Sequence, residues 1–566
     1  MFMPGITFSA SRPAWAGLSS RADVALFVGC VARTGTAVPA ALRSELEEGG
    51  WSPTGLFRTN AARLDALLDI PVPIESWSEF ESLYDWNRRP AAPLSADMLP
   101  TALGLAVKGF FEEGGAKAYV VRTGDPLPLA DPNAKTADEN ASRRRLLSWT
   151  DKDAPADAAE RAPILPGLGD RGDGADPADP KTWRGAATIY AVSDAAMLVI
   201  PDLIDLCAGS PIPVPPVPER PGPPEQFKPC APPAPDLAPE ARAARPEYQA
   251  PRLDEAGYAL WASALQFALE LLGRPKGPAH RRDVMLVSAF PLPVVESRFR
   301  TRKDAGLPSS AGGFGAAEEV WPLAILDRKG IPSANGKLFD AAVIGNARLQ
   351  LAYPWIETTA SLNLPEGLQS PEGLLAGMVA RTSLADGAFR SAAGRPCRSP
   401  RRLYPDLDES DMRRGLPGGA SDWLGERLCL IGMKRGRIEL VSDSTMAPDR
   451  KWRAGGVSRL MGIILRAARL FGDDLMFEPS GPRLWGRIQS TVESFLDDLW
   501  QRGALDGRSR DDAFTVDCNE TSMTQADLDA GRVICRIGFT AAYPIQHINV
   551  SLLLLEAAGA RAREAA

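Results

Sequence analysis

The sequence predicts a mixed α/β fold built from several domains. Short apolar runs of the kind that form buried strands, such as 24–29 and 284–288, alternate with longer segments whose apolar residues follow the helical period. The chain has 566 residues, which is enough for several domains that each bury a core of their own. Its hydrophobic content of 45% and its charged content of 24% are those of an ordinary globular protein.

A short arm is predicted at residues 1–20. Its residues Ile6, Thr7, Phe8 and Ser9 alternate between apolar and polar as a strand edge does, before Arg12-Pro13 interrupts the pattern. An isolated strand leaves its backbone groups without partners. We therefore expect this arm to pair with another sheet.

The first part of a core is predicted over 21–123. Its elements are, in order, a buried strand at 24–29, a helix that starts with a capping box formed by Ser76 and Glu79, a helix over 103–113 closed by Gly114 and Gly115, and a strand at 118–122.

The middle of the chain, 124–345, is predicted to be an inserted outer region. Residues 124–182 are rich in Asp, Ala, Pro and Gly and poor in aromatic residues, so we expect an irregular, exposed segment. A strand at 195–203, a helix at 254–272 and a strand at 284–288 then predict a βαβ unit with parallel pairing. Residues 211–251 hold 15 prolines, which favours a stiff, extended polyproline II strap.

Two amphipathic helices dominate the next predicted domain, 346–540. The first spans 456–471, and its apolar face consists of Val457, Leu460, Met461, Ile464, Ala468 and Phe471. Arg459, Arg466 and Arg469 fall off that face, on the polar side. The second helix spans 483–501, with a buried stripe of Leu484, Ile488, Val492, Phe495 and Leu499. Its other side carries Arg483, Arg487, Ser490, Ser494 and Asp497.

Two alternating strands are predicted near the end of the chain. A short helix begins with Thr524 and Asp527, and the run 532–540 then places Val533, Cys535, Ile537 and Phe539 on one side. The last segment, 541–566, contains a second alternating strand formed by Ile548, Val550, Leu552 and Leu554, followed by an exposed tail.

The composition excludes several classes of partner and site. The net charge is −7, whereas nucleic-acid binding needs clustered Lys and Arg, so no nucleic-acid partner is expected. No apolar run approaches 18 residues and no signal peptide is evident, so no membrane insertion is expected. The seven cysteines are scattered and form no CxxC pair, which favours reduced, buried thiols over a disulfide framework or a zinc site.

Sequence motifs for catalysis are absent. The chain has no GxxxxGK[ST] loop, no GxSxG elbow and no HExxH helix, and neither of its two histidines has a carboxylate or cysteine partner nearby in sequence. Carboxylate pairs such as Asp497-Asp498 are more typical of a solvated helix face than of a hydrolase. We therefore predict no catalytic residue, no metal and no cofactor.

The order of parts from Trp485 to Val550 resembles the C-terminal region of contractile tail sheath proteins, which occur in contractile phages and in contractile injection systems. Further similarities are Phe477-Glu478-Pro479 before the second helix, Ala352-Tyr353-Pro354-Trp355, and the run from Ser370 to Thr382. The resemblance extends in order over residues 4–125, 184–293 and 346–555. The run Ala388–Gly394 departs from the family pattern.

The resemblance implies a function that does not depend on bond chemistry. It implies a major structural subunit that forms stacked hexameric rings around an inner tube protein and contracts to drive the tube through a target envelope. Further partners would be baseplate and tail-terminator or cap proteins, and assembly would take place in the bacterial cytoplasm. The arm at 1–20 and the strand at 548–554 would be donated to neighbouring subunits, and the 483–501 helix would face the tube.

Two alternatives remain open at this stage. One is a minor sheath-like component of a baseplate or cap, present in a few copies. The other is a carboxylate-dependent enzyme with a βαβ core and an acidic cleft, which the missing motifs disfavour.

Overall fold

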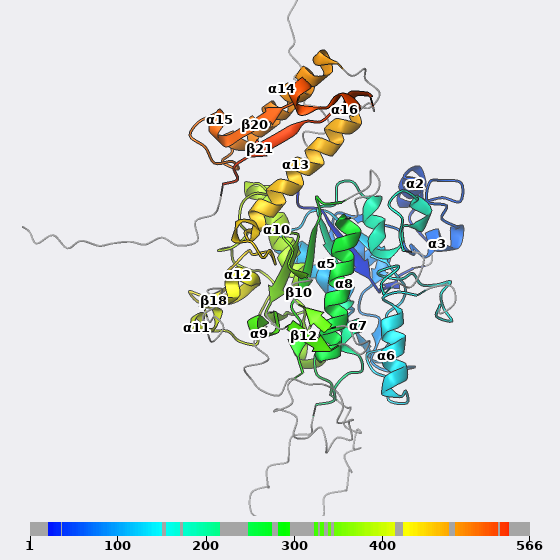
Figure 1. Ribbon diagram of the computed structural model, residues 1–566. Coiled ribbons are helices and arrows are strands. Elements are labelled where there is room, and N and C mark those ends of the chain that lie inside the picture. Colours follow the sequence, from blue (N-terminus) through cyan, green and yellow to red (C-terminus); the bar gives the residue numbers. More distant parts are fainter. Residues whose placement is uncertain are drawn as a thin grey trace, which may run out of the picture.

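An eight-stranded sheet organises most of the chain in the computed structural model (Figure 1). The structure describes residues 21–35, 37–149, 154–169, 174–214, 247–273, 281–294, 322–326, 329–332, 338–340, 344–413, 423–474, 481–529 and 532–542. The strand order is β19-β18-β14-β10-β8-β1-β7-β3. The bounds are β19 Arg437–Leu440, β18 Cys429–Lys434, β14 Leu349–Tyr353, β10 Met285–Ala289, β8 Met197–Val199, β1 Ala25–Gly29, β7 Ala118–Arg122 and β3 Val72–Ile74.

The six inner strands of this sheet, from β18 to β7, pair in parallel, and only the two edge strands are antiparallel to their neighbours. Parallel strands need crossover connections, which place helices on both faces of the sheet. The βαβ unit predicted from the sequence is confirmed, because β8 and β10 pair in parallel and α8 (Glu255–Gly273) connects them. The prediction of a mixed α/β fold is likewise confirmed.

Each face of the sheet has its own hydrophobic core. On one face, α5 (Ala102–Glu113) and α10 (Glu372–Asp386) pack over Phe27, Val120 and their neighbours. The two helices cross closely, since a Cβ on Gly373 or Gly377 would collide with the backbone of α5. On the other face, α8 and α7 (Leu203–Ala208) pack over a second apolar cluster.

Local capping follows the sequence predictions closely. Helix α4 (Trp77–Leu83) starts at Ser76, whose hydroxyl accepts a hydrogen bond from the backbone N–H of Glu79. Helix α5 ends at Gly114, which has a φ of 107° and so takes the left-handed conformation that glycine favours.

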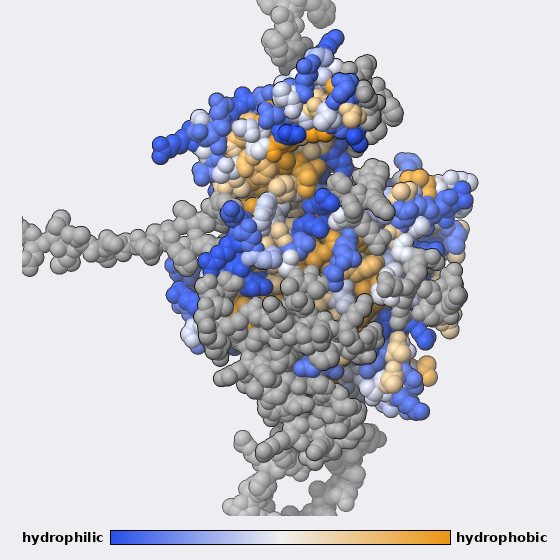
Figure 2. Space-filling view, in the orientation of Figure 1, coloured by the Kyte–Doolittle hydropathy of each residue, from blue (hydrophilic) through white to orange (hydrophobic). Residues whose placement is uncertain are grey.

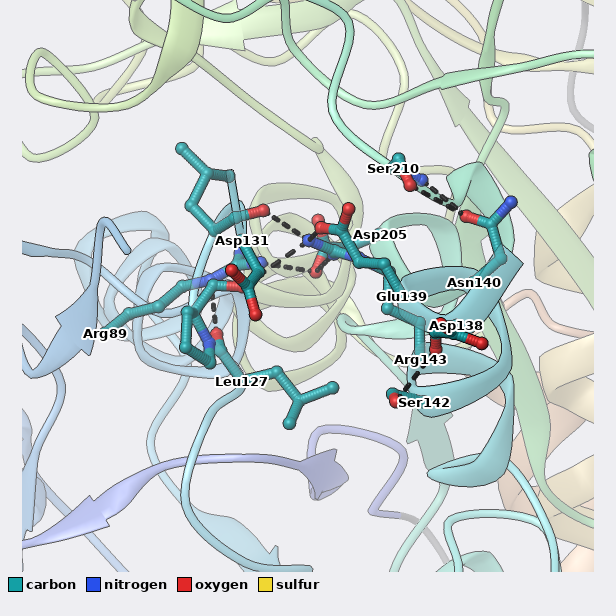
Figure 3. A network of polar contacts seen from close by, with 12 residues as sticks. Arg89, Leu127, Asp131, Asp138, Glu139, Asn140, Ser142, Arg143, Asp205 and Ser210 are labelled. Carbon is teal, nitrogen blue, oxygen red and sulfur yellow. Dashed lines mark hydrogen bonds and ion pairs between the residues drawn. The ribbon is translucent and has the colours of Figure 1, made fainter. Parts of the chain in front are cut away.

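The segment 124–182 differs from the irregular, exposed insertion predicted for it. It contains helix α6 (Thr136–Arg145), and Leu146, Leu147, Ile164 and Leu165 belong to the hydrophobic core. Arg143 of α6 is buried between Asp205 and the backbone carbonyl of Leu129, and Arg89 donates to the same Asp205 carboxylate (Figure 3). The prediction was wrong because this segment buries aliphatic residues and so needs few aromatic ones. In addition, Asp205, the partner of Arg143, lies 62 residues away in the sequence.

The prediction that 124–345 forms a separate outer region does not agree with the strand order of the large sheet. Strands β8 and β10 lie between β1 and β14, in the middle of the same sheet as the first and last core strands. Of the predicted proline-rich strap, residues 215–246 lie outside the described part of the chain.

A smaller unit is connected to the sheet domain by the long helix α13 (Gly455–Asp474), as Figure 1 shows. We define the C-terminal unit as the described residues 481–542. It contains α14 (Pro482–Gln501), α15 (Arg510–Ala513), β20 (Phe514–Asp517), α16 (Gln525–Asp529) and β21 (Arg536–Phe539). Within it, Thr524 and Asp527 exchange backbone and side-chain hydrogen bonds at the start of α16, as predicted.

Candidate assembly site in the C-terminal unit

Strands β20 and β21 form a two-stranded antiparallel sheet in the C-terminal unit. Phe514 lies opposite Phe539, and Val516 lies opposite Ile537. Phe514 and Val516 are buried while Thr515 and Asp517 are exposed, so β20 alternates as a strand with one covered face does. On β21 the predicted alternation is confirmed, since Ile537 and Phe539 are half-buried and Arg536 and Gly538 are exposed.

Both outer edges of this small sheet are without a strand partner in the part of the chain that the structure describes. A two-stranded sheet is marginal by itself, and an edge strand presents backbone N–H and C=O groups to any extended segment that can pair with it. The β20–β21 sheet could therefore accept a further strand at either edge.

An apolar hollow lies beside the two-stranded sheet, between α13 and α14. Its lining residues are Ile464, Ala467, Ala468, Phe471, Thr491, Val492, Phe495, Leu496 and Ile537. Figure 2 shows hydrophobic residues gathered on the side of the C-terminal unit that faces the sheet domain. Contiguous apolar surface of this kind is typical of an interaction site.

Helix α14 presents the polar face that the sequence predicts. Arg483, Arg487, Ser490 and Ser494 are exposed, and Asp497 is half-buried and accepts a hydrogen bond from Gln501 at 2.7 Å. On the inner face Leu484 and Leu499 are buried, whereas Ile488, Val492 and Phe495 are only partly buried. Trp485 and Leu496 are also buried there, although the predicted stripe did not include them.

The residues predicted to be donated to neighbouring subunits lie outside the described residues. They are Ile6, Thr7, Phe8, Ser9, Ile548, Val550, Leu552 and Leu554. Strand donation therefore stays a prediction.

The arginines of α13 differ from the sequence prediction. Arg459 and Arg466 were expected on a polar face, yet each is only 3% exposed. Arg459 forms two hydrogen bonds of 2.6 and 3.1 Å with the buried carboxylate of Asp443. Arg466 and Arg469 lie beside the buried carboxylate of Asp283 at 3.4 and 3.0 Å, and Arg281 binds the same group. The prediction failed because these carboxylates belong to distant segments.

These ion pairs join α13 to the sheet domain. Burial disfavours a charged carboxylate, but the Arg459 guanidinium and two further hydrogen-bond donors, the N–H of Ala392 and the side chain of Gln350, hold the pKa of Asp443 below its ordinary value. The pKa of Asp283 is lowered in the same way by Arg281, Arg469 and Arg466, against the effect of burial. Helix α13 is therefore fixed to the sheet domain from Arg459 to Arg469 by charge as well as by packing.

Two buried carboxylic acids, Asp202 and Glu372, lie near the carboxyl ends of the parallel strands. Among the described residues, no group of three or more His, Cys, Asp or Glu side chains could hold a metal ion. No described helix is long and apolar enough to span a bilayer.

Comparison with known proteins relates this geometry to a family. Residues 447–552 match the family model of the phage tail sheath C-terminal domain. No curated protein sequence matches the chain.

Solved structures extend the similarity over the whole chain. One match is to a chain of the anti-feeding prophage (AFP) baseplate in its contracted state, at 16% identity and a TM-score of 0.52, covering 98% of this chain and 97% of that one. A second is to the sixfold-symmetrised AFP baseplate, at 16% identity and a TM-score of 0.50, covering 98% of this chain and 100% of that one. A third is to the contracted PVC sheath complex of an extracellular contractile injection system, at 15% identity and a TM-score of 0.47, covering 98% of each chain.

The resemblance to contractile tail sheath proteins is thus confirmed. Residues 447–552 match the phage tail sheath C-terminal family model, and the whole chain has the fold of the two AFP baseplate chains.

Proposed function

We propose that this chain is the major subunit of a contractile sheath. In this proposal it forms stacked hexameric rings around an inner tube and contracts to push the tube through a target envelope. The observation that carries the proposal is the two-stranded sheet β20–β21, which lies beside an apolar hollow and has a free edge on each side in the described chain.

Donated strands supply what this sheet lacks. The arm at 1–20 and the segment 548–554 both alternate between apolar and polar residues in sequence. Adding an extended segment to a sheet edge gives backbone hydrogen bonds along the edge and pockets for alternate side chains. If each subunit donates strands and accepts them, the contact is head-to-tail and repeats through a lattice.

Contraction in this proposal needs no nucleotide and no catalytic group. A lattice with two packings can store free energy in the looser one, and the summed gain of many subunits on closing drives the movement. The exposed face of α14, led by Arg483 and Arg487, would contact acidic groups of the inner tube. Exposed ion pairs contribute only about 0–1 kcal/mol each, which suits a contact that must release on contraction.

A minor role in a baseplate or cap is the second candidate. It is favoured by the similarity to chains in two AFP baseplate structures. Copy number in the purified particle separates the two candidates, since a major sheath subunit is present in many rings and a baseplate component in a few copies.

Deletion of residues 1–18 tests the proposal. The unaltered chain is expected to form striated hollow tubes or cogwheel rings in negative-stain microscopy. The truncated chain is expected to remain a folded monomer, because it retains the sheet domain and the C-terminal unit but has lost the N-terminal strand that would link it to a neighbouring subunit. A matched control deletes the tail residues 558–566 and should still assemble. Long tubes from the chain that lacks 1–18 would contradict strand donation by the arm.

A further inference from the structure

The β19 edge of the large sheet carries an excess of positive charge. Strands β18 and β19 are joined by a tight turn in which Arg435 and Gly436 have φ values of 51° and 75°, the positive values that a two-residue hairpin of this type requires. The segment before β17 (Arg402–Tyr404) runs along β19, where the N–H of Cys397 donates to the carbonyl of Ile438 at 2.9 Å. This arrangement brings basic residues from two distant segments to one edge.

We define the basic edge as Arg398, Arg401, Arg435 and Arg437. All four side chains are exposed, and none has an ion pair or side-chain hydrogen bond within the described residues. Their basic neighbours are already paired, Arg402 with Glu357 at 2.7 Å and Lys434 with Glu439 at 3.6 Å.

An open hollow of about 420 Å³ lies beside the basic edge. Leu403, Tyr404, Met433 and Ile438 contribute to its lining, and Asp406 is the one acidic residue among the lining side chains. Met433 is 53% exposed, so apolar side-chain surface is accessible between the arginines. A surface of this kind fits an acidic partner that also presents apolar groups.

The opposite edge of the same sheet is acidic. The edge strand β3 leads directly into helix α4, and we define the acidic edge as Glu75, Glu79, Glu81 and Asp85. The three glutamates are exposed and Asp85 is half-buried, and none of the four forms an ion pair within the described part of the chain.

The cations near the acidic edge are largely engaged elsewhere. Lys108 lies over the rings of Trp77 and Trp86, with its Nζ 5.2 and 4.9 Å from the ring centroids. Arg21 donates two hydrogen bonds to Asp23. Arg33 donates to the backbone carbonyl of Leu83, and Arg88 is exposed, so the four acidic side chains of the edge still outnumber the nearby cations that have no carboxylate or aromatic partner.

We propose that the basic edge of one subunit docks on the acidic edge of a second copy. Two complementary surfaces on opposite edges of one sheet form a head-to-tail contact, and such a contact closes into a ring when the rotation between copies allows it. The chain as a whole is negatively charged, with a net charge of −7, so copies repel unless these edges meet. The inference rests on the proposed function and identifies a lateral contact within a ring, separate from strand donation.

Charge reversal on each edge tests this contact. The first variant is Arg435→Glu with Arg437→Glu, and the second is Glu75→Lys with Glu79→Lys. All four side chains are exposed, and the N–H of Glu75 that bonds the Glu79 carboxylate can bond water instead, so both variants should fold with unchanged thermal midpoints. In each variant the altered edge then carries two positive and two negative side chains, so its attraction for the unaltered edge of another copy is lost. At about 0.1 M salt, where screening acts over roughly 10 Å, neither should form rings or tubes by itself.

Mixing the two variants in equal amounts gives the sharpest result. In the mixture the introduced glutamates of one variant can face the introduced lysines of the other, and the two unaltered edges can also meet. A ring with an even number of subunits can alternate the two variants. We expect rings and tubes to return in the mixture, and also in the single chain that carries all four changes. A control with Lys135→Glu and Arg145→Glu, two exposed charges on α6, should assemble normally.

The outcomes separate this contact from the proposed function. If either reversed variant assembles alone as well as the unaltered chain, the edge contact is wrong. If both fail and the mixture also fails, the basic edge binds something other than the acidic edge of a second copy, which likewise overturns the inference. If the unaltered chain forms neither rings nor tubes, the proposed function itself fails, and the inference fails with it.

Discussion

Glu372 and Asp202 are buried acids without an ion pair among the described residues. Glu372 is 2% exposed, and its carboxyl group accepts a hydrogen bond of 2.7 Å from the hydroxyl of Ser370. Burial raises its pKa to about 7, and the nearby Asp202 carboxylate reinforces the rise. Burial also raises the pKa of Asp202 to about 7, against the hydrogen bond from the N–H of Cys30. Near neutral pH the folded chain therefore holds protons that the unfolded chain releases.

The pH dependence of stability follows from this difference. A carboxyl group whose pKa is raised on folding stabilises the fold below its ordinary pKa, and the contribution is lost as the pH rises through the folded pKa. For Glu372 that window runs from 4.5 to about 7. Because one pKa unit corresponds to about 1.4 kcal/mol, the loss for Glu372 is on the order of 3 kcal/mol.

Glu372→Gln should remove most of that loss. Glutamine keeps a carbonyl oxygen for the Ser370 hydroxyl and carries no charge at any pH, so the urea midpoint of the variant should fall less between about pH 5 and about pH 8 than that of the unaltered chain. The measurement uses the chain without residues 1–18, to keep it unassembled. Glu409→Gln, on an exposed side chain, is the control and should behave like the unaltered chain. Equal pH slopes for Glu372→Gln and the control would show that Glu372 is ionised in the folded state.

At the scale of single elements, local signals in the sequence were sufficient for the long helices α5, α8, α13 and α14 and for four strands of the eight-stranded sheet, β1, β7, β8 and β10, whereas β3, β14, β18 and β19 were not predicted. Strand β7 spans Ala118–Arg122 as predicted, and α14 spans Pro482–Gln501 against a predicted 483–501. These elements are defined by apolar periodicity and by capping residues within a few positions. Helix α6 was missed because its sequence, TADENASRRR, has no apolar face of its own, and the buried Arg143 is stabilised by Asp205 of a different helix.

The candidate site was predictable only in part, for the same reason. The polar face of α14 could be found from its period, but the sequence does not show that β20 and β21 form a sheet of their own, with both edges open. Likewise, the basic edge combines Arg398 and Arg401 with Arg435 and Arg437, which lie more than thirty residues further along the chain. Such surfaces depend on the tertiary fold, which brings their parts together.

Helix α14 allows a test of the tube contact at the scale of one element. Arg483→Glu with Arg487→Glu reverses two exposed charges and leaves the buried Leu484 and Trp485 unchanged, so the subunit should fold normally. If this face contacts an acidic inner tube, the weak attraction of about 0–1 kcal/mol per pair becomes repulsion. Particles should then show sheath without a tube, or sheath that contracts prematurely, in electron microscopy.

The matched control for this test is Arg508→Glu, an exposed arginine of the same unit that lies outside α14. It should give normal extended particles. Normal extended particles from the double variant as well would place the tube contact on another surface.

At the scale of the whole molecule, helix α13 is the connection between the sheet domain and the C-terminal unit. Asp443 and Asp283 hold it through three of its arginines, while apolar residues between Ile464 and Phe471 line the hollow together with α14. In a contracting sheath, movement of the donated strands would reach the sheet domain through this helix. A connection of that kind must be stiff, and buried ion pairs with several hydrogen bonds favour one fixed geometry.

Asp443→Asn tests how firmly α13 is held. Removing one charge of a buried pair leaves the other uncompensated and typically costs about 3–5 kcal/mol, because Arg459 cannot reach water from its buried position. The unfolding free energy of the unassembled chain should fall by that amount. The exposed pair of Arg510 and Glu493 gives the control, since Glu493→Gln should cost at most about 1 kcal/mol.

Replacing both partners, with Asp443→Asn and Arg459→Met, should restore part of the loss, because no charge then remains buried without a partner. If Asp443→Asn is as mild as Glu493→Gln, water reaches Arg459 in solution, and α13 is held to the sheet domain by apolar packing instead of by charge.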